Sequence, residues 1–274
     1  MVHSDWGDWL PRRIAAADPD GVAIWSLGCN GFVLKDEAGT TLFIDPYLGT
    51  GDPPRTVRMI PVPFEPTDVV EADAILGTHE HVDHVHGPTQ GPILARTGAT
   101  LYAPGASVRL TEEEAWVERW HLEREQVVAV EAGDRHDIGA FSVTVGPAYD
   151  PDADEPVSYV IEHPAGTVFH AGDSKPTDAF ERLGADFDID VAIVAFGSTG
   201  YLEEAEGPAR TTWYCDENEA VSIASAVRAE TLLPSHWDMW RGVRADPTVL
   251  YRHIQSWTHP EALTILEIGD RVDL

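Results

Sequence analysis

Cysteine is nearly absent from the sequence, which contains only Cys29 and Cys215. Two cysteines cannot form the disulfide framework on which small secreted domains depend. The first residues also lack a basic segment followed by an apolar one, so they do not resemble a secretory signal. We therefore expect a reducing location, the cytoplasm.

Basic residues are also scarce. The 18 Lys and Arg, of which only Lys35 and Lys175 are lysines, are opposed by 47 Asp and Glu, and the formal net charge is −29. The acids are spread along the chain, so the sequence offers no broad basic surface for nucleic acid. An acidic surface with so little lysine resembles halophile proteins, in which molar salt screens the repulsion. We therefore expect a halophilic protein.

Long hydrophobic runs are missing as well. No apolar run approaches the roughly 20 residues of a membrane helix, so we expect no membrane span. Hydrophobic residues still make up 43% of the 274 positions, which excludes a disordered chain and allows a full core. No repeat and no Pro/Gly/Ser linker divides the chain, so we expect one domain over residues 1–274.

Short apolar strands alternate with a few helical segments, which predicts sheets covered by helices. Strands are expected at 22–27, 32–35, 41–44, 72–76, 141–145, 158–162, 167–170, 191–195, 232–233 and 263–268. Helices are expected at 4–17, 106–120, 216–229 and 247–257. In the third helix, Asp216 is followed three residues later by Glu219, which is a capping-box pattern. The Pro- and Gly-rich segment 50–66 reads as a long loop, and such loops often border a site.

The most specific pattern is His79-x-His81-x-Asp83-His84, directly after the expected strand at 72–76. Imidazole and carboxylate groups are ligands of divalent Zn, Mn and Fe. Side chains two residues apart in an extended backbone point the same way, so His79 and His81 can bind one ion while Asp83 and His84 face a second. The spacing therefore predicts a metal site.

This motif and three further elements resemble the metallo-β-lactamase superfamily, and they occur along the chain in the order expected for it. The further elements are Asp45 after the strand at 41–44, His170-Ala171-Gly172-Asp173-Ser174, and Pro234-Ser235-His236. The resemblance implies an αβ/βα four-layer sandwich, with two mixed sheets flanked by helices and a dinuclear metal site on one edge. It also implies that Asp173 bridges the two metals, that His236 is the last ligand, and that Asp45 supports the metal loop.

Other stretches narrow the resemblance to the L-ascorbate-6-phosphate lactonase branch of this superfamily. They are Trp6-Gly7-x-Trp9-Leu10, Trp25-x-Leu27-Gly28-Cys29-x-Gly31, Gly49-Thr50-Gly51 and His236-x-Asp238-x-Trp240. The chain is shorter than that branch after Gly51, between Asp150 and Val157, and at the carboxyl end. Substrate contacts would lie in those places, so the substrate stays open. The resemblance is also compatible with a homo-oligomer.

The sequence departs from the superfamily pattern at one metal ligand. Many members carry a third histidine for the first metal between the two main motifs, whereas residues 145–152 contain none. Asp150 is our candidate replacement, because carboxylate oxygen also binds these ions. Asp152 and Asp154 are alternatives, and all three also fit a solvated acidic surface.

The expected cofactor is therefore a pair of divalent ions, Zn²⁺ or Mn²⁺. His79, His81 and Asp173, with Asp150, would hold the first ion, and Asp83, His84, Asp173 and His236 the second. A metal-activated hydroxide would open a lactone or cleave an ester of a small metabolite, with or without a phosphate group. Asp83 would orient this nucleophile.

Three other residues are candidates for further roles. His170 is either a proton donor or support for a ligand, or else a packed core histidine. Lys175 and Arg210 are candidate contacts for a substrate phosphate, because basic residues are so few. The expected partner is a small molecule, with no nucleic acid and no membrane. Two alternatives stay open: a phosphodiesterase or ribonuclease of the same fold, and a non-catalytic metal-binding module.

Overall fold

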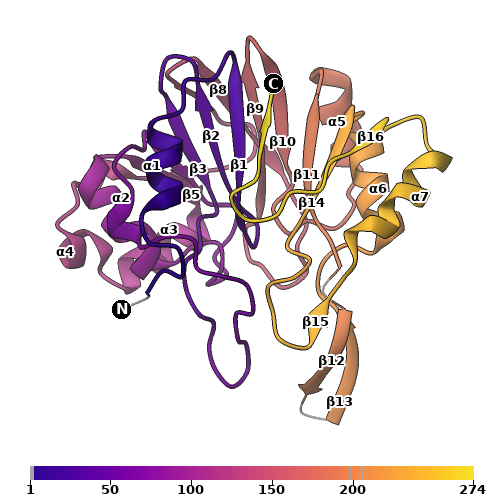
Figure 1. Cartoon of the computed structure of the whole chain (residues 1–274), viewed down its shortest axis with the longest axis horizontal. Helices are drawn as coiled ribbons and strands as arrows, with labels where there is room; N and C mark the ends of the chain where they lie inside the picture. Colours follow the sequence, from indigo (N-terminus) through magenta and orange to yellow (C-terminus); the bar gives the residue numbers. More distant parts are fainter. Residues whose placement is uncertain (1–2, 198, 205–206) are drawn as a thin grey trace.

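Two seven-stranded mixed sheets form the centre of the protein in a computed structural model that describes residues 3–197, 199–204 and 207–274 (Figure 1). The strands of the first sheet are β1 (Val22–Gly28), β2 (Gly31–Asp36), β3 (Thr41–Ile44), β4 (Ala74–Leu76), β5 (Thr100–Pro104), β6 (Val127–Val130) and β17 (Arg271–Asp273). Their spatial order is β17-β1-β2-β3-β4-β5-β6. Strands β3 to β6 are parallel, and the other pairs are antiparallel.

The second sheet contains the later strands of the chain. These are β7 (Arg135–Ile138), β8 (Phe141–Pro147), β9 (Val157–His163), β10 (Gly166–His170), β11 (Val191–Ala195), β14 (Thr231–Ser235) and β16 (Ala262–Leu263). Their spatial order is β16-β14-β11-β10-β9-β8-β7. Strands β10, β11, β14 and β16 are parallel, so both sheets are mixed, as predicted.

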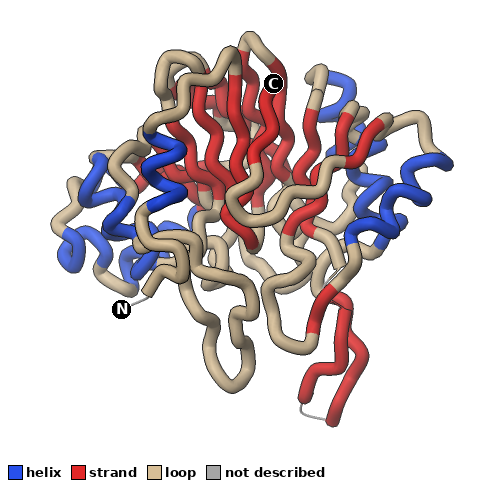
Figure 2. Tube along the Cα trace, in the orientation of Figure 1, coloured by secondary structure: helices blue, strands red, loops and turns tan. Residues whose placement is uncertain are grey.

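Helices cover the outer faces of both sheets (Figure 2). On the first sheet lie α1 (Trp9–Ala15), α2 (Gly87–Thr97), α3 (Gly105–Glu113) and α4 (Trp116–Trp120). On the second lie α5 (Ala179–Asp186), α6 (Glu217–Ala226) and α7 (Leu250–His253). Short 3₁₀ turns are η1 (Pro66–Asp68), η2 (Arg124–Gln126), η3 (Pro247–Val249) and η4 (Ile254–Ser256). The prediction of an αβ/βα four-layer sandwich is confirmed.

The strand β1 illustrates how the layers are built. Val22 and Ile24 face the core between the sheets, whereas Ala23, Trp25 and Leu27 face the core beneath the helices of the first sheet. Successive side chains of a strand point to opposite faces, and here both faces are covered. The strand therefore reads as a nearly continuous apolar run rather than as an alternating one.

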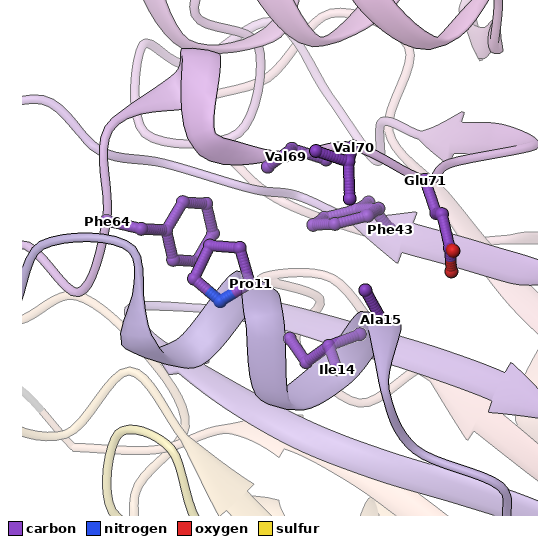
Figure 3. Close-up of a pocket in the computed structure, with 8 residues that line it drawn as sticks. All are labelled: Pro11, Ile14, Ala15, Phe43, Phe64, Val69, Val70 and Glu71. Carbon is purple, nitrogen blue, oxygen red and sulfur yellow. The ribbon is translucent and has the colours of Figure 1, made fainter.

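Helix α1 packs on the outer face of the first sheet. Pro11 and Ile14 meet Phe43 of β3 and Phe64 of the following loop (Figure 3). These side chains enclose a space of about 10 Å³, which is room for about one water molecule. The close-up therefore shows a packing seam and not a ligand site.

Four expected elements differ in the structure. The helix expected at 4–17 begins only at Trp9 and ends at Ala15, as α1. The helix expected at 106–120 is split into α3 and α4 at Ala115, which has a positive φ of 54°. The helix expected at 247–257 consists of short turns around α7. The strand expected at 263–268 is wrong, because β16 ends at Leu263, and the next strand, β17, begins only at Arg271. The apolar residues 265 and 266 contribute to core packing without strand pairing.

A third, small sheet lies outside the sandwich. It consists of β12 (Thr199–Glu204), β13 (Gly207–Thr212) and β15 (Val243–Arg244), in the order β13-β12-β15. The hairpin of β12 and β13 projects beyond the lower edge of the two main sheets (Figure 1). No strand was predicted from the sequence in any of these three segments.

The candidate ligands follow strands that end at one edge of the sandwich. Strands β3 and β4 are parallel in the first sheet, and β10 and β14 run parallel to β11 in the second. Because carboxyl ends of parallel strands meet at one edge, the loops after these strands come together there. None of the helices in the described part of the chain combines the length and apolarity that a bilayer crossing needs.

Candidate metal centre

The loop after β4 is held in place by the buried carboxylate of Asp45. Asp45 accepts the backbone N–H of Thr78 at 2.8 Å and the Thr78 hydroxyl at 2.7 Å. It also accepts a hydrogen bond from His84 Nδ1 at 2.7 Å. The Thr78 hydroxyl lies 2.9 Å from His79 Nδ1. With both Nδ1 atoms engaged, His79 and His84 turn their Nε2 atoms toward the site, which is the supporting role predicted for Asp45.

Three side chains form the first ligand group: His79, His81 and Asp150. His79 Nε2 lies 2.9 Å from His81 Nδ1 and 3.5 Å from Asp150 Oδ2. The distance from His81 Nδ1 to Asp150 Oδ2 is 3.6 Å. Tetrahedral ligands with bond lengths near 2.0 Å lie about 3.3 Å apart, so this spacing suits one ion. Asp150 thus occupies the place for which the sequence offers no third histidine.

The second ligand group is the set expected to hold the second ion, Asp83, His84, Asp173 and His236, whose side chains lie close together. His236 Nε2 lies 3.1 Å from Asp83 Oδ2 and 3.8 Å from Asp173 Oδ2. His84 Nε2 lies 3.2 Å from Asp173 Oδ2 and 3.9 Å from Asp83 Oδ2. Asp173 Oδ2 is also 4.0 Å from His79 Nε2 of the first ligand group. Asp173 therefore lies between the two groups, where a bridging ligand was expected.

The donor set fits cations rather than an internal hydrogen-bond network. His84 Nε2 is fully buried and faces two carboxylates, at 3.2 Å from Asp173 Oδ2 and 3.9 Å from Asp83 Oδ2, but it makes no well-aligned hydrogen bond with any residue that the structure describes. Burial lowers the pKa of His84, but Asp173, Asp45 and Asp83 together raise it well above its usual value. Carboxylates that favour a proton on this ring also favour a metal ion in its place.

The other ligands have protonation states that suit metal binding. Burial, and then the neighbouring His84, lower the pKa of His79 well below its usual value, which leaves a neutral imidazole. Burial alone would raise the pKa values of Asp83 and Asp173, but His84 and His236 hold both well below the usual range. Metal ligands must be deprotonated, so these side chains are ready to bind.

His170 is not a wall of the site but a buried support. Its Nε2 donates to the Asn30 carbonyl at 3.1 Å, and its Nδ1 accepts the Gly172 N–H at 3.1 Å. Asn30 in turn donates from Nδ2 to Asp173 Oδ1 at 3.0 Å and accepts from Ser235 at 2.6 Å. With both ring nitrogens bound to backbone, His170 has no proton to offer a product, so the geometry favours support over proton donation.

An open cavity of about 590 Å³ lies over the two ligand groups. Its acidic side chains include Asp83, Asp150 and Asp173, and its other residues are Asp52, Arg55, Thr56, His81, Val82, Asp152, Trp213, Tyr214 and Trp240. Among these lining residues, Arg55 is the only Lys or Arg. Tyr214 also stacks on the His236 ring, with centroids 3.9 Å apart. The cavity therefore combines a metal-binding floor, an aromatic side and one cation.

The two predicted phosphate contacts lie elsewhere. Lys175 Nζ donates to the Tyr214 carbonyl at 2.7 Å and pairs with Glu219 at 3.1 Å, outside the cavity lining. Arg210 is exposed on the projecting hairpin and does not line the cavity either. The structure thus does not bring Lys175 or Arg210 to the ligand groups.

The two alternatives to Asp150 are not members of the first ligand group. The Asp152 backbone carbonyl, not its carboxylate, lies 3.2 Å from His81 Nε2. The Asp154 backbone N–H donates to Glu80 at 2.8 Å. Of the three candidates, only Asp150 joins His79 and His81 as a ligand group.

Sequence reasoning missed four residues of this region. Asn30 lies in the Gly28–Gly31 stretch that carried the family resemblance, and Arg55 lies in the long loop expected to border a site. Tyr214 and Trp213 had no sequence signal, because nothing local shows that the segment after β13 returns to the cavity.

Comparison with known proteins gives the same result. The family model for the beta-lactamase superfamily domain matches residues 40–237. The protein named Probable L-ascorbate-6-phosphate lactonase UlaG of Escherichia coli is 26% identical over 286 aligned positions, which cover 89% of this chain and 77% of that protein. The protein of the same name from Escherichia fergusonii has the same identity and coverage.

Solved structures share the fold. Igni18, a metallo hydrolase from the archaeon Ignicoccus hospitalis, superposes with a TM-score of 0.67 at 20% identity and covers 92% of this chain and 97% of its own. CmlA, a diiron beta-hydroxylase from Streptomyces venezuelae, has a TM-score of 0.69 at 19% identity and covers 93% of this chain and 55% of its own. The matched family model, the four-layer sandwich and the ligand groups agree. The chain belongs to the beta-lactamase superfamily, as a metal-dependent hydrolase with the metallo-β-lactamase fold.

Proposed function

We propose that the protein opens a lactone, or cleaves an ester, of a small phosphorylated metabolite, with two divalent ions, Zn²⁺ or Mn²⁺, per chain. The observation that carries the proposal is the pair of ligand groups that lie on either side of Asp173 beneath one cavity. Two adjacent ions suit attack by water on a carbonyl, because one site can serve the nucleophile and the other the oxygen under attack. The similarity to lactonases supports this substrate class.

The metal pair, when bound, supplies an activated water and an electrophile for the carbonyl oxygen. Asp83 lines the cavity, and its low pKa keeps it a carboxylate at neutral pH. It therefore holds the attacking water by accepting a hydrogen bond from it. The water oxygen adds to the carbonyl carbon, the ring C–O bond breaks, and the freed alkoxide takes one of the two protons of the attacking water, while the other proton is released to solvent as the new acid ionises. The products are one carboxylate and one alcohol.

Arg55 is our proposed contact for the substrate phosphate. Its guanidinium is the only Lys or Arg side chain among the residues that line the cavity, in a setting of several carboxylates. These carboxylates would repel a phosphate, so the cavity needs a cation that can donate two hydrogen bonds to it, as a guanidinium does. Trp213 and Trp240 offer apolar surfaces for the carbon skeleton.

We place this reaction in the cytoplasm. Both cysteines are free and buried in the structure, and a metabolite phosphate is an intracellular class of substrate. The high content of acidic residues and the small number of lysines are compatible with a cytoplasm rich in salt.

The test is hydrolysis by metal-loaded protein in high salt. Three substrates are compared: a sugar-derived lactone phosphate, the same lactone without phosphate, and bis-p-nitrophenyl phosphate. We expect hydrolysis of the lactone phosphate with the highest kcat/KM. Activity on bis-p-nitrophenyl phosphate without lactonase activity would replace the proposal by a phosphodiesterase, and metal binding without any hydrolysis would leave a binding module.

Arginine variants test the recognition step. Loss of a hydrogen bond to a charged group costs about 1.5–3 kcal/mol, so Arg55→Ala should lower kcat/KM for the lactone phosphate by about tenfold or more. The lactone without phosphate should be hydrolysed as before. Arg182→Ala, on the exposed side of α5, is the matched control. If Arg210→Ala gave the loss instead, the phosphate contact would lie on the β12–β13 hairpin and Arg55 would be excluded.

A further inference from the structure

Cys29 lies in the turn between β1 and β2, directly beside the second ligand group. Its Sγ is 3.5 Å from His236 Nε2 and 3.8 Å from Asp83 Oδ2. The residue is buried, and Cys29, Asp83 and His236 together form a potential ligand set of their own. Neither the superfamily motifs described above nor the proposed reaction gives this thiol a role.

The distances suit a shared metal ion better than a hydrogen bond. Tetrahedral ligands at the usual Zn–S and Zn–N bond lengths lie about 3.6 Å apart, which is close to both separations from Sγ. The thiol also lies 3.7 Å from the Asp83 carbonyl and 3.9 Å from His236 Nδ1. One weak S–H donor cannot satisfy all these neighbours, whereas one cation can bind sulfur, carboxylate and imidazole together.

The backbone holds Cys29 and His236 in a fixed relation. Both adopt the left-handed region, with φ of 57° and 63°, which non-glycine residues seldom occupy. The His236 N–H donates to the Cys29 carbonyl at 2.9 Å, so the two turns are joined at this point. Strained backbone of this kind persists where the surroundings require it and often accompanies a functional site. The strain here directs a sulfur and an imidazole toward the same place.

We propose that Cys29 supplies a thiolate ligand to the metal ion of the second ligand group, together with Asp83 and His236. On binding, the S–H bond gives its proton to solvent, and the sulfur donates the resulting electron pair to the ion. A thiolate favours Zn²⁺, Fe²⁺ or Co²⁺ over Mn²⁺, so the second position is selective for the softer ions. The first ligand group has only nitrogen and oxygen donors and lacks this selectivity.

This inference rests on the metal pair of the proposed function but not on the substrate. The test uses full-length protein loaded with Co²⁺ in place of the resident metal. A cobalt–thiolate bond produces an intense charge-transfer band in the near ultraviolet, which nitrogen and oxygen ligands do not give. We expect the band in the wild type and its loss in Cys29→Ala.

Cys215→Ala is the matched control. Cys215 is also buried, but its Sγ donates to the Ser174 carbonyl at 3.3 Å and belongs to no ligand set among the described residues. The control should keep the band. Zn²⁺ affinity, measured against a competing chelator, should fall at least about tenfold in Cys29→Ala, since even the loss of a residue that only supports a ligand costs that much.

A measurement without a variant covers the case in which Cys29→Ala does not fold. X-ray absorption of the Zn-loaded wild type should show one sulfur neighbour at about 2.3 Å per two metal ions. Absence of sulfur from this spectrum, or a cobalt band that persists in Cys29→Ala, would overturn the proposal. Sulfur ligation without hydrolysis would reject the proposed function alone, and hydrolysis without sulfur ligation would reject only the role of Cys29.

Discussion

At the scale of single residues, three carboxylates have distinct places in the candidate metal centre. Asp45 orients His84, Asp150 completes the first ligand group, and Asp173 joins the two groups. Each is buried or nearly so beside histidines, where an unpaired negative charge is costly. Bound cations would offset this cost, so removal of one carboxylate should be visible in the metal content.

Asp150 offers the first residue-scale prediction. Asp150→Ala removes one of three donors from the first ligand group and should lower the metal content from two ions to one per chain. Asp152→Ala, two residues away, should keep two ions, because its carboxylate is not part of that group. Elemental mass spectrometry of both variants gives the answer. Equal metal content in the two variants would show that Asp150 is not a ligand.

Asn30 offers the second residue-scale prediction. Asn30→Ala removes the donor that holds Asp173 Oδ1, and loss of such a supporting contact lowers metal affinity by about 10–100-fold. Ser235→Ala removes only the other partner of Asn30 and should have a smaller effect. Chelator competition measures both affinities. An unchanged affinity in Asn30→Ala would contradict the supporting role of the His170–Asn30 network.

Residue types and spacing pointed to the segment from His79 to His84, whereas Asp173 and His236 were expected only from the family resemblance, and the structure brings these side chains close together. The supporting residues could not be predicted, since a hydrogen bond such as that from Asn30 to Asp173 joins positions 143 residues apart. For the same reason, the scarcity of basic residues was a poor guide to the contacts of a substrate phosphate. Lys175 instead donates hydrogen bonds to the Tyr214 carbonyl and to Glu219, and only the three-dimensional fold shows these contacts.

At the scale of elements, local signals predicted some helices and strands well and others poorly. The strands at 41–44 and 191–195 have the predicted bounds, because apolar runs of this short length, flanked by turns, suit a strand and are too short for a typical helix. The Asp216 cap of α6 is confirmed, with its carboxylate accepting the N–H groups of Asn218 and Glu219. The hairpin β12–β13 has no comparable pattern and was missed.

The cap of α6 gives a prediction at this scale. Asp216→Ala should destabilise the protein by about 1 kcal/mol, the usual cost of a lost N-cap. For a chain of this size the melting temperature should fall by about 2–4 °C. Asp178→Ala at the start of α5 is the control, because Asp178 makes no side-chain capping hydrogen bond. Equal shifts of the melting temperature in the two variants would show that the Asp216 cap does not stabilise this helix.

At the scale of the whole molecule, charge is the dominant feature. The net charge of −29 is spread over the chain, and the metal cavity is itself rich in carboxylates. At about 0.1 M salt these charges repel one another over about 10 Å, and at about 1 M salt over only about 3 Å. The halophilic character, the single domain over residues 1–274 and the homo-oligomer stay predictions.

The dependence of the melting temperature on salt tests the halophilic character. The melting temperature should rise between about 0.1 M and 2 M KCl as screening removes repulsion from the folded state. The same series in metal-loaded and metal-free protein separates surface screening from effects at the centre. A melting temperature that is flat or falls over this range would reject the halophilic interpretation.

The most direct measurement for the central claim is the number of metal ions bound per chain. Protein purified at high salt without added metal is analysed by elemental mass spectrometry, alongside Asp173→Ala, which lacks the carboxylate that lies between the two ligand groups. We predict two ions per wild-type chain and the loss of at least one in the variant. A wild-type chain with no bound ion, even after Zn²⁺ or Mn²⁺ is offered, would contradict the dinuclear centre.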